Sequence, residues 1–368
     1  MKIEDYTGKY NEITRSLIKH FAKVKKGENI VLSPMSVIML LGILADAVGG
    51  KTRDEIVRII GDGFSYEELM TILKQIQEEA SETGALMSSN AVCVNDTIKG
   101  SIKDGYEEHL KESFDGRLFL SADIVKDVNA WVKEKTNGMI ENAADESMNQ
   151  TLACLMNAIA FCAEWMEEYE EDDIHEGDFN NADGTVSEVQ MLESSEDTYI
   201  EDDFFTGFMK PYKDEQYAFM ALLPKKKSVS FLLRAVKQID FGKLFDAASY
   251  GTVYVTMPEF KYDFGENLTA LCEEMGIHTV FTPEADFSPM SSEWLKVDSI
   301  LHKAHIEVDR HGTKAAAVTM AVVVAGCAPD FDNIKEVRLN RPFIYAIMDT
   351  KTGLPVFTGI YNNAEGEL

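Results

Sequence analysis

Apolar residues recur at helical spacing near the start of the chain. The pattern predicts a helix over residues 10–24, carried by Tyr10, Ile13, Leu17, Phe21 and Val24. A short strand is predicted over residues 29–32. Ser33 and Pro34 then form a helix start, with a capping hydroxyl and a proline suited to the first turn. Residues 35–47 are apolar almost all round, so we predict a deeply buried helix there.

The pattern after residue 47 alternates between helices and strands. Thr52 and Glu55 have the spacing of a capping box for the next helix. "LACLMNAIAFCAEW" at 152–165 is a continuous apolar run that predicts a buried central strand. Residues 172–183 are acidic and predict a turn region, whereas residues 344–361 predict a hairpin around Lys351, Thr352 and Gly353. With no repeat or linker in sight, we expect one α+β domain over residues 1–368, with eight or nine helices.

Charge excludes two classes of partner. Lys and Arg number 35 against 63 Asp and Glu, and the formal net charge is −28. Such an excess of negative charge argues against nucleic acid or an anionic membrane as a partner. No apolar run reaches membrane-spanning length, and the first residues predict a helix rather than a signal peptide. Composition alone leaves the compartment open.

The usual signatures of catalytic and metal sites are missing from the sequence. The five cysteines form no CxxC pair, so we expect buried free thiols for four of them, namely Cys93, Cys154, Cys162 and Cys272. There is no GxSxG or HExxH motif, and the seven histidines lack ligand spacing. We therefore expect no catalytic residue, no metal and no cofactor.

One segment resembles a phosphate-binding loop. "ADAVGGKT" at 45–52 fits a relaxed form of that motif, which would make the protein a nucleotide binder. A phosphate loop follows a strand, but here the predicted buried helix precedes the glycines. We therefore favour a helix–loop–helix junction.

Residues 311–330, "HGTKAAAVTMAVVVAGCAPD", are nearly uncharged in a highly charged chain. Alternate positions from Thr313 are small and uncharged, namely Thr313, Ala315, Ala317, Thr319, Ala321 and Val323. Gly312 gives the backbone freedom to turn, and no proline interrupts residues 313–328. The 14 residues from Thr313 to Gly326 would span roughly 45 Å when extended. The composition suits a segment that enters the middle of a sheet, although a permanently buried strand would have the same composition.

Several motifs along the chain carry a family resemblance. They are "NIVLSPMSV", "VNAWVKEKTNGMI", "LMNAIAFCAEW", "VFTPEADFSPMS", "VDSILHKAHIEVD", "GTKAAAVT" and "LNRPFIYAIMDTKTGLPVFTGI". In this order, over more than 300 residues, they resemble the serpin family. The resemblance implies an α+β serpin fold with three β-sheets, a five-stranded main sheet among them, and about nine helices. It also implies an exposed reactive-centre loop at about residues 310–336.

The resemblance implies an inhibitor rather than an enzyme. Serpins offer the loop to a protease as bait, form an acyl-enzyme, and trap it by inserting the loop into the main sheet. The hinge that starts this insertion would be Gly312, Thr313, Ala315, Ala316, Ala317 and Thr319. Bulky or charged hinge residues mark family members that do not inhibit, and this hinge has none. The alternative is a non-inhibitory serpin that acts as a chaperone or binding protein.

Counting the usual loop length places the reactive bond at Gly326–Cys327. Cleavage after Val324 or Ala325 is also open, and the long stretch to Arg341 leaves Asp330 or Phe331 as later choices. The small residues suit elastase-like or subtilisin-like serine proteases with shallow pockets.

Two further clusters follow from the resemblance. The family's breach, where the loop enters the sheet, often pairs an acidic residue with a base. Here Arg310 replaces the acid, and Glu259 occupies the matching position, so we expect the same pair with exchanged charges. We expect Arg310→Glu to accelerate insertion or polymerisation, and the double variant that exchanges both charges to restore normal behaviour.

The family's shutter, which controls opening of the central strands, is the second cluster. It matches Ser33, Ser36, Asn157 and His302, a set able to form a buried hydrogen-bond network.

The expected partner is a target serine protease, held in a covalent acyl complex by a monomeric inhibitor. Residues 67–82 contain one lysine, so we expect no heparin-type activation site. The resemblance favours a secreted protein.

Overall fold

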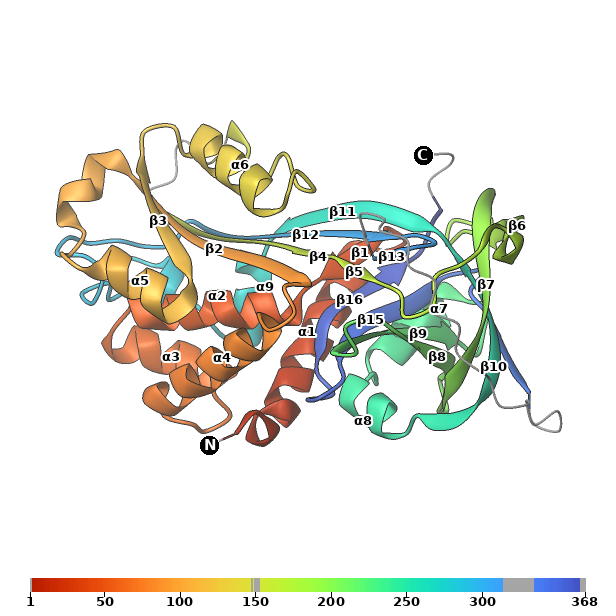
Figure 1. Cartoon of the computed structure of the whole chain (residues 1–368). Helices are drawn as coiled ribbons and strands as arrows, with labels where there is room; N and C mark the ends of the chain where they lie inside the picture. The colour runs from red at the N-terminus through yellow and green to blue at the C-terminus, as the bar shows by residue number, and fades with distance from the viewer. Residues whose placement is uncertain (1, 147, 149–152, 314–333, 365–368) are drawn as a thin grey trace. The chain divides into compact units, whose positions relative to one another are not determined.

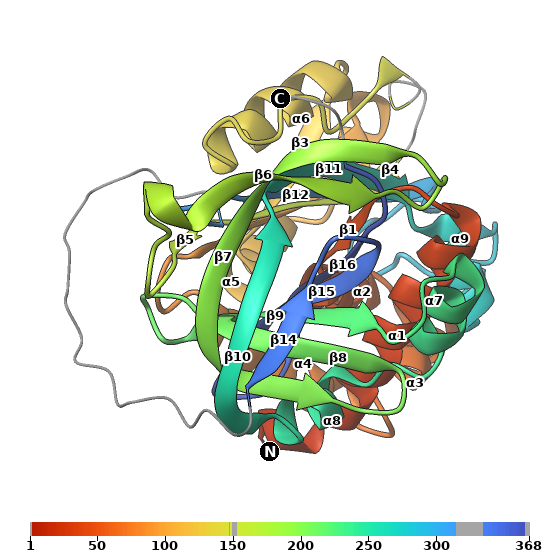
Figure 2. The same ribbon diagram turned by 90° about the vertical axis from the view of Figure 1, so that its right-hand side faces the viewer.

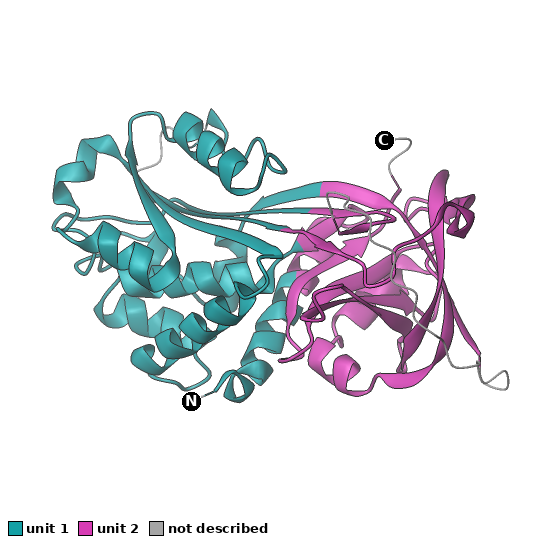
Figure 3. Cartoon of the chain, in the orientation of Figure 1, with its two compact units in different colours: residues 1–17, 32–160, 263–305 teal, residues 18–31, 161–262, 306–368 magenta. Residues whose placement is uncertain are grey.

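A computed structural model of the chain describes residues 2–146, 148, 153–313 and 334–364. These residues divide into two compact units (Figure 3). Unit 1 comprises Met1–Leu17, Leu32–Ala160 and Asp263–His305, and unit 2 comprises Ile18–Val31, Phe161–Tyr262 and Ile306–Leu368.

Nine α-helices and sixteen strands form the described part (Figure 1). The helices are α1 Thr7–Val24, α2 Pro34–Ala47, α3 Gly50–Ile60, α4 Tyr66–Ala80, α5 Tyr106–Phe114, α6 Ile124–Lys135, α7 Val229–Val236, α8 Phe241–Asp246 and α9 Thr269–Met275. The strands are β1 Ile30–Leu32, β2 Leu86–Asn95, β3 Gly116–Ser121, β4 Ala153–Phe161, β5 Ala163–Glu164, β6 Ile174–Asn180, β7 Val186–Glu201, β8 Phe205–Pro211, β9 Tyr217–Pro224, β10 Ser249–Pro258, β11 Phe260–Asn267, β12 Ser299–Val308, β13 Gly312–Thr313, β14 Lys335–Arg338, β15 Phe343–Asp349 and β16 Pro355–Tyr361.

The first sheet has the order β3-β2-β4-β12-β13-β5, with β11 also paired to β12. Five of these strands are long, as expected for the main sheet, and β5 and β13 have two residues each. β4 and β12 pair in parallel from Cys154 with Ser299 to Ala160 with His305. Every residue of β4 is buried, which confirms the predicted central strand.

In unit 1 this sheet is covered on both faces. Helix α6 packs on β2 and β3, and Trp131 of α6 makes an edge contact with Phe119 of β3 at 5.4 Å between ring centroids. Helices α2 to α5 lie on the opposite side of these strands (Figure 1). Burial of both faces explains why the central strands are continuous apolar runs.

Helix α2 matches its sequence prediction. All 14 of its residues are buried, Pro34 begins it, and the hydroxyl of Ser33 accepts a hydrogen bond from the backbone N–H of Ser36. The predicted capping box at Thr52 is wrong, because Gly49 caps α3 and the Thr52 hydroxyl accepts the N–H of Asp286 instead. The segment 45–52 joins α2 to α3, so it lacks the strand that a phosphate loop requires.

Unit 2 contains most of a nine-stranded sheet with the order β1-β16-β15-β9-β8-β7-β10-β14, and β6 pairs with β7. Three sheets were expected, but hydrogen bonds join the described strands into two. The 16-residue β7 is the reason, since it pairs with β6, β8 and β10 along its length (Figure 2). Of the acidic segment 172–183 predicted as a turn, residues 174–180 form strand β6 and residues 182–183 form a turn. Strands β15 and β16 form the predicted hairpin, with Gly353 at φ 66°.

Three of the four expected buried thiols are buried, namely Cys93, Cys154 and Cys272. The prediction is wrong for Cys162, which is partly exposed between β4 and β5. Within the described residues, no helix combines the length and the apolar character needed to cross a bilayer.

Candidate functional site

The start of the predicted insertion segment is already paired in the sheet. Strand β13 runs antiparallel to β12, with Thr313 opposite Val308, and antiparallel to β5, with Gly312 opposite Glu164. β5 follows β4 after one residue. Gly312 and Thr313 therefore occupy a strand position between the end of β12 and the continuation of β4. The other hinge positions (315, 316, 317 and 319) and the reactive-bond candidates (324–327) lie outside the described residues.

A tight turn delivers the chain into this position. The Asp309 carboxylate accepts hydrogen bonds from the backbone N–H groups of His311 and Gly312 at 2.8 and 3.1 Å. The backbone N–H of Asp309 donates in turn to the Gly312 carbonyl at 2.9 Å. An aspartate that bonds the backbone two residues ahead is a standard way to stabilise a turn, so Asp309 sets the direction of β13.

Gly312 is required by a close approach of two backbones. A Cβ at this position would meet the Ala163 carbonyl oxygen directly and would lie 2.8 Å from the Cα of Glu164. Both are backbone atoms of β5, so the strand would have to shift. A glycine here lets β13 lie against β5 at strand distance.

Thr313 is anchored below the turn. It is fully buried, and its hydroxyl shares a hydrogen bond of 2.6 Å with the hydroxyl of Tyr212. Tyr212 stacks on Trp165 with ring centroids 4.6 Å apart, and the Trp165 indole N–H donates to the Asp309 carbonyl at 2.9 Å. Burial raises the pKa of Tyr212 well above its ordinary value, so the phenol stays protonated. Sequence analysis missed Tyr212, because nothing in its local sequence links it to the hinge 101 residues later.

The structure brings the predicted breach pair together. The Arg310 Nε lies 3.5 Å from Glu259 Oε1, and the same oxygen accepts the Arg310 backbone N–H at 3.1 Å. Sequence analysis missed a second partner, Glu171, whose Oε1 lies 2.9 Å from Arg310 Nη1. The next residue, His311, has its Nδ1 2.8 Å from Glu168 Oε2. Carboxylates therefore hold the two residues that precede the predicted hinge.

These contacts change the result that we expect when the charges of Arg310 and Glu259 are exchanged by mutation. Arg310→Glu would place a carboxylate against Glu259 and Glu171, so we expect spontaneous polymerisation at elevated temperature to accelerate about fivefold, which corresponds to roughly 1 kcal/mol. The double variant with Glu259→Arg should recover only part of this. The carboxylate at position 310 would still face Glu171, and an arginine at position 259 cannot accept the backbone N–H. Native gels over time measure both rates, and equal rates in wild type and Arg310→Glu would contradict the prediction.

The four residues predicted to form the shutter are fully buried in unit 1. His302 of β12 lies opposite Asn157 of β4, and its Nε2 accepts the backbone N–H of Ser33 at 3.1 Å. Asn157 instead donates to Asn90 at 3.0 Å and to Ser88 at 3.2 Å, both on β2. The shutter residues thus connect β12 to the start of α2, and β4 to β2.

Burial makes His302 neutral. Desolvation, with a smaller contribution from Lys303, lowers the pKa of His302 to about 3. Among the described residues, three buried polar atoms of the shutter have no hydrogen-bond partner, namely Ser36 Oγ, Asn157 Oδ1 and His302 Nδ1.

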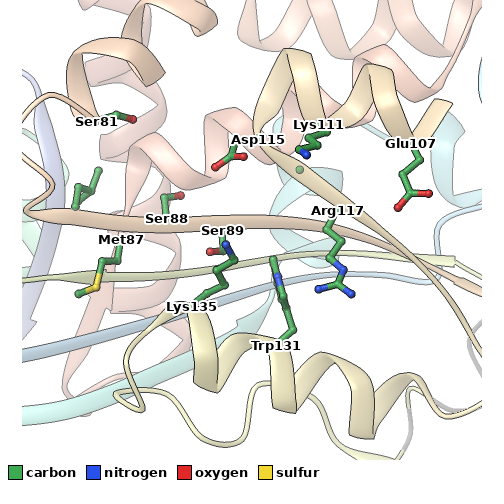
Figure 4. A pocket seen from close by; sticks show the side chains of 12 residues that line it. Ser81, Met87, Ser88, Ser89, Glu107, Lys111, Asp115, Arg117, Trp131 and Lys135 are labelled. Atoms are coloured by element: carbon green, nitrogen blue, oxygen red, sulfur yellow. The ribbon is translucent and has the colours of Figure 1, made fainter. Parts of the chain in front are cut away.

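A cavity of about 560 Å³ opens beside Ser88, the β2 residue that accepts a hydrogen bond from Asn157 (Figure 4). Ser88 and Ser89 of β2 line it, with Arg117 of β3 and Lys135 of α6 beside Trp131. Its wall carries both signs of charge, since Glu107, Lys111 and Asp115 also line it.

Helix α4 lies in the region where we looked for a heparin-type site. It contains Lys74 as its single lysine, and the Lys74 ammonium lies 3.9 Å from the Glu78 carboxylate. The absence of a heparin site stays a prediction.

Comparison with known proteins decides the family. The family model described as "Serpin (serine protease inhibitor)" matches residues 9–364. The chain belongs to the serpin family. Among curated relatives, this serpin is 30% identical to Serpin-Z10 of Arabidopsis thaliana over 95% of this chain and 96% of that protein. Among solved structures, it is similar to the thermophilic serpin tengpin in the native state, with a TM-score of 0.87, 30% identity, and coverage of 98% of this chain and 94% of that one.

The family is one of protease inhibitors in general rather than of enzymes. A further solved structure, thyroxine-binding globulin in complex with thyroxine, has a TM-score of 0.84 at 21% identity, covering 97% of this serpin and 98% of that chain. At that identity the likeness shows a common fold alone.

Proposed function

We propose that this serpin irreversibly inhibits serine proteases with shallow, elastase-like or subtilisin-like specificity pockets. The observation that carries the proposal is the pairing of Gly312 and Thr313 between β12 and β5. Two residues of the insertion segment already have strand neighbours on both sides, and the residues that follow are uncharged except for Lys314 up to residue 328.

The chemistry starts at the reactive bond. The protease serine oxygen attacks the carbonyl carbon of the residue before the bond, which we place at Gly326–Cys327. The peptide C–N bond breaks, and the amine leaves as a new N-terminus after taking a proton from the protease. The carbonyl stays on the serine as an ester. Trapping requires the freed loop to enter the sheet before water hydrolyses that ester.

Strand pairing supplies a driving force for insertion. β4 and β12 form parallel pairs from Cys154 with Ser299 to Ala160 with His305. β13 is antiparallel to both of its neighbours. A loop that continues in that direction would replace one parallel pairing with two antiparallel ones, which are slightly more stable per residue.

The small residues at positions 324–326 support the choice of target. Valine, alanine and glycine present little volume to a specificity pocket, and none carries a charge for a trypsin-like pocket to recognise. We therefore expect proteases with shallow apolar pockets to cleave at this point.

The test is to mix the protein with pancreatic elastase and, separately, with subtilisin, and to run denaturing gels. We expect a complex that survives denaturation, together with a released C-terminal peptide beginning at Ala325, Gly326 or Cys327 by mass spectrometry. The control is the same protease with its serine blocked, which should form no complex. Complete cleavage by both proteases without any complex would contradict the proposal for these targets and would favour the non-inhibitory chaperone or binding role.

A further inference from the structure

A second cavity, of about 340 Å³, lies within unit 2. The β6–β7 turn, the end of β9, the start of α7 and the residues before β15 line it. Three cationic side chains contribute to its wall, namely Lys226, Lys227 and Arg341, and no acidic side chain does among the described residues. We propose that this cavity binds a small organic anion, with a carboxylate or phosphate group on a compact apolar body.

The cations are available to a ligand. Within the described ranges, none of the three forms an ion pair. Lys226 lies 5.7 Å from the centre of the Phe231 ring. Arg341 is half-buried, and its Nη2 donates to the Pro224 carbonyl at 2.7 Å, which orients the guanidinium and leaves further N–H donors. In a chain of net charge −28, three cations with no carboxylate among the described lining residues form a local site of positive potential.

The remaining wall suits an apolar group. Pro224 and Leu232 are buried, and Val229 and Pro342 are partly exposed. A pocket with an apolar lining and a few charged groups is the usual form of a small-molecule site, and the volume lies near the lower end for such sites. A molecule about the size of a substituted benzene ring with one anionic group fits this description, whereas a polyanion would not enter.

The walls are held in place without a ligand. Both the backbone N–H and the side-chain amide of Asn180 donate to the Asn340 carbonyl at 2.9 and 3.0 Å. The Asn181 amide donates to the hydroxyls of Thr185 and Ser187, and its oxygen accepts the N–H of Ala364. A preformed wall lowers the ordering cost of binding.

The cavity shown in Figure 4 is the strongest alternative site for an anion, since three cationic side chains also line it. Glu107 and Asp115 line that cavity too, so its potential is mixed. The cavity in unit 2 has charge of one sign and an apolar wall, which is why the inference rests on it.

The test uses phenyl phosphate as the probe, titrated calorimetrically into the full chain at low salt. Inorganic phosphate, phenol and benzoate are titrated alongside. We expect phenyl phosphate to bind at least about tenfold more tightly than inorganic phosphate, because the ring adds burial of apolar area. Whichever of phenyl phosphate and benzoate binds more tightly identifies the preferred anionic group.

The decisive variant is Lys226→Glu with Lys227→Glu, both exposed positions whose change should leave the fold intact. It should weaken binding at least about tenfold, which corresponds to one charge-assisted hydrogen bond. The matched control is Lys237→Glu with Lys243→Glu, which makes the same charge change in unit 2 outside the cavity and should alter binding less than about twofold.

Three outcomes would overturn the inference: no binding of either aromatic anion, equal affinity for inorganic phosphate, or equal loss in the control. This inference goes beyond the proposed inhibition, and since no protease is present, it can fail independently.

Discussion

Thr313→Arg is expected to turn this serpin from an inhibitor into a substrate. Thr313 is fully buried between β12 and β5, and its hydroxyl is bonded to Tyr212. A guanidinium in this place has no carboxylate among the side chains that bond to Thr313, and burying an unpaired charge costs several kcal/mol. Since about 1.4 kcal/mol corresponds to a factor of ten, the yield of trapped protease should fall at least about 100-fold while cleavage of the loop continues.

Denaturing gels and the ratio of inhibitor consumed per protease inactivated measure this effect. Thr313→Ser keeps the hydroxyl and should trap normally. Thr313→Val keeps the shape but leaves Tyr212 without its partner, so it should lie between wild type and the arginine variant. Normal trapping by Thr313→Arg would show that burial of residue 313 in the sheet is not needed for trapping, and would contradict the hinge assignment.

A second large effect should appear as acid sensitivity of the native state. The folded-state pKa of His302 is about 3, below the ordinary value of 6.5, because the imidazole is buried. The unfolded chain therefore binds a proton at a higher pH than the folded one. The stability contributed by neutral His302 is fully present above about pH 6.5 and is lost as the pH falls toward 3, at about 1.4 kcal/mol per pH unit, or roughly 5 kcal/mol in all.

Denaturant unfolding between pH 7.5 and pH 4 measures this loss, and His302→Gln isolates it. The glutamine variant is expected to be less stable at pH 7.5, since it alters the bond to the Ser33 N–H, but its stability should depend less steeply on pH. The control is His278→Gln, an exposed histidine, which should keep the wild-type slope. An identical slope in wild type and His302→Gln would contradict the prediction.

Much of the site was predictable because its parts carry local or pairwise signals. A hinge that must enter a sheet needs small uncharged residues, and the pattern from Thr313 meets that demand. Arg310 and Glu259 were paired through the family resemblance, and the structure places them 3.5 Å apart. The same resemblance predicted the serpin fold, which the family model confirms. The hinge and breach roles of these residues stay proposals.

The sequence by itself determined this protein's family, because several motifs occur in the family's order. It also determined the buried helix α2 and the central strand β4, because burial on all sides imposes continuous apolarity that can be read locally. Only the tertiary structure decided which distant groups meet. It placed Tyr212 under Thr313 and brought Glu171 to Arg310. It also set the Ala163 carbonyl against Gly312, so that a glycine is required there for space rather than for a turn. Strand β7 joins strands that were expected to form separate sheets. The Thr52 hydroxyl accepts a hydrogen bond from the Asp286 N–H instead of capping α3. Each of these depends on strand register or on contacts between residues far apart in the chain, which leave no mark on the local pattern.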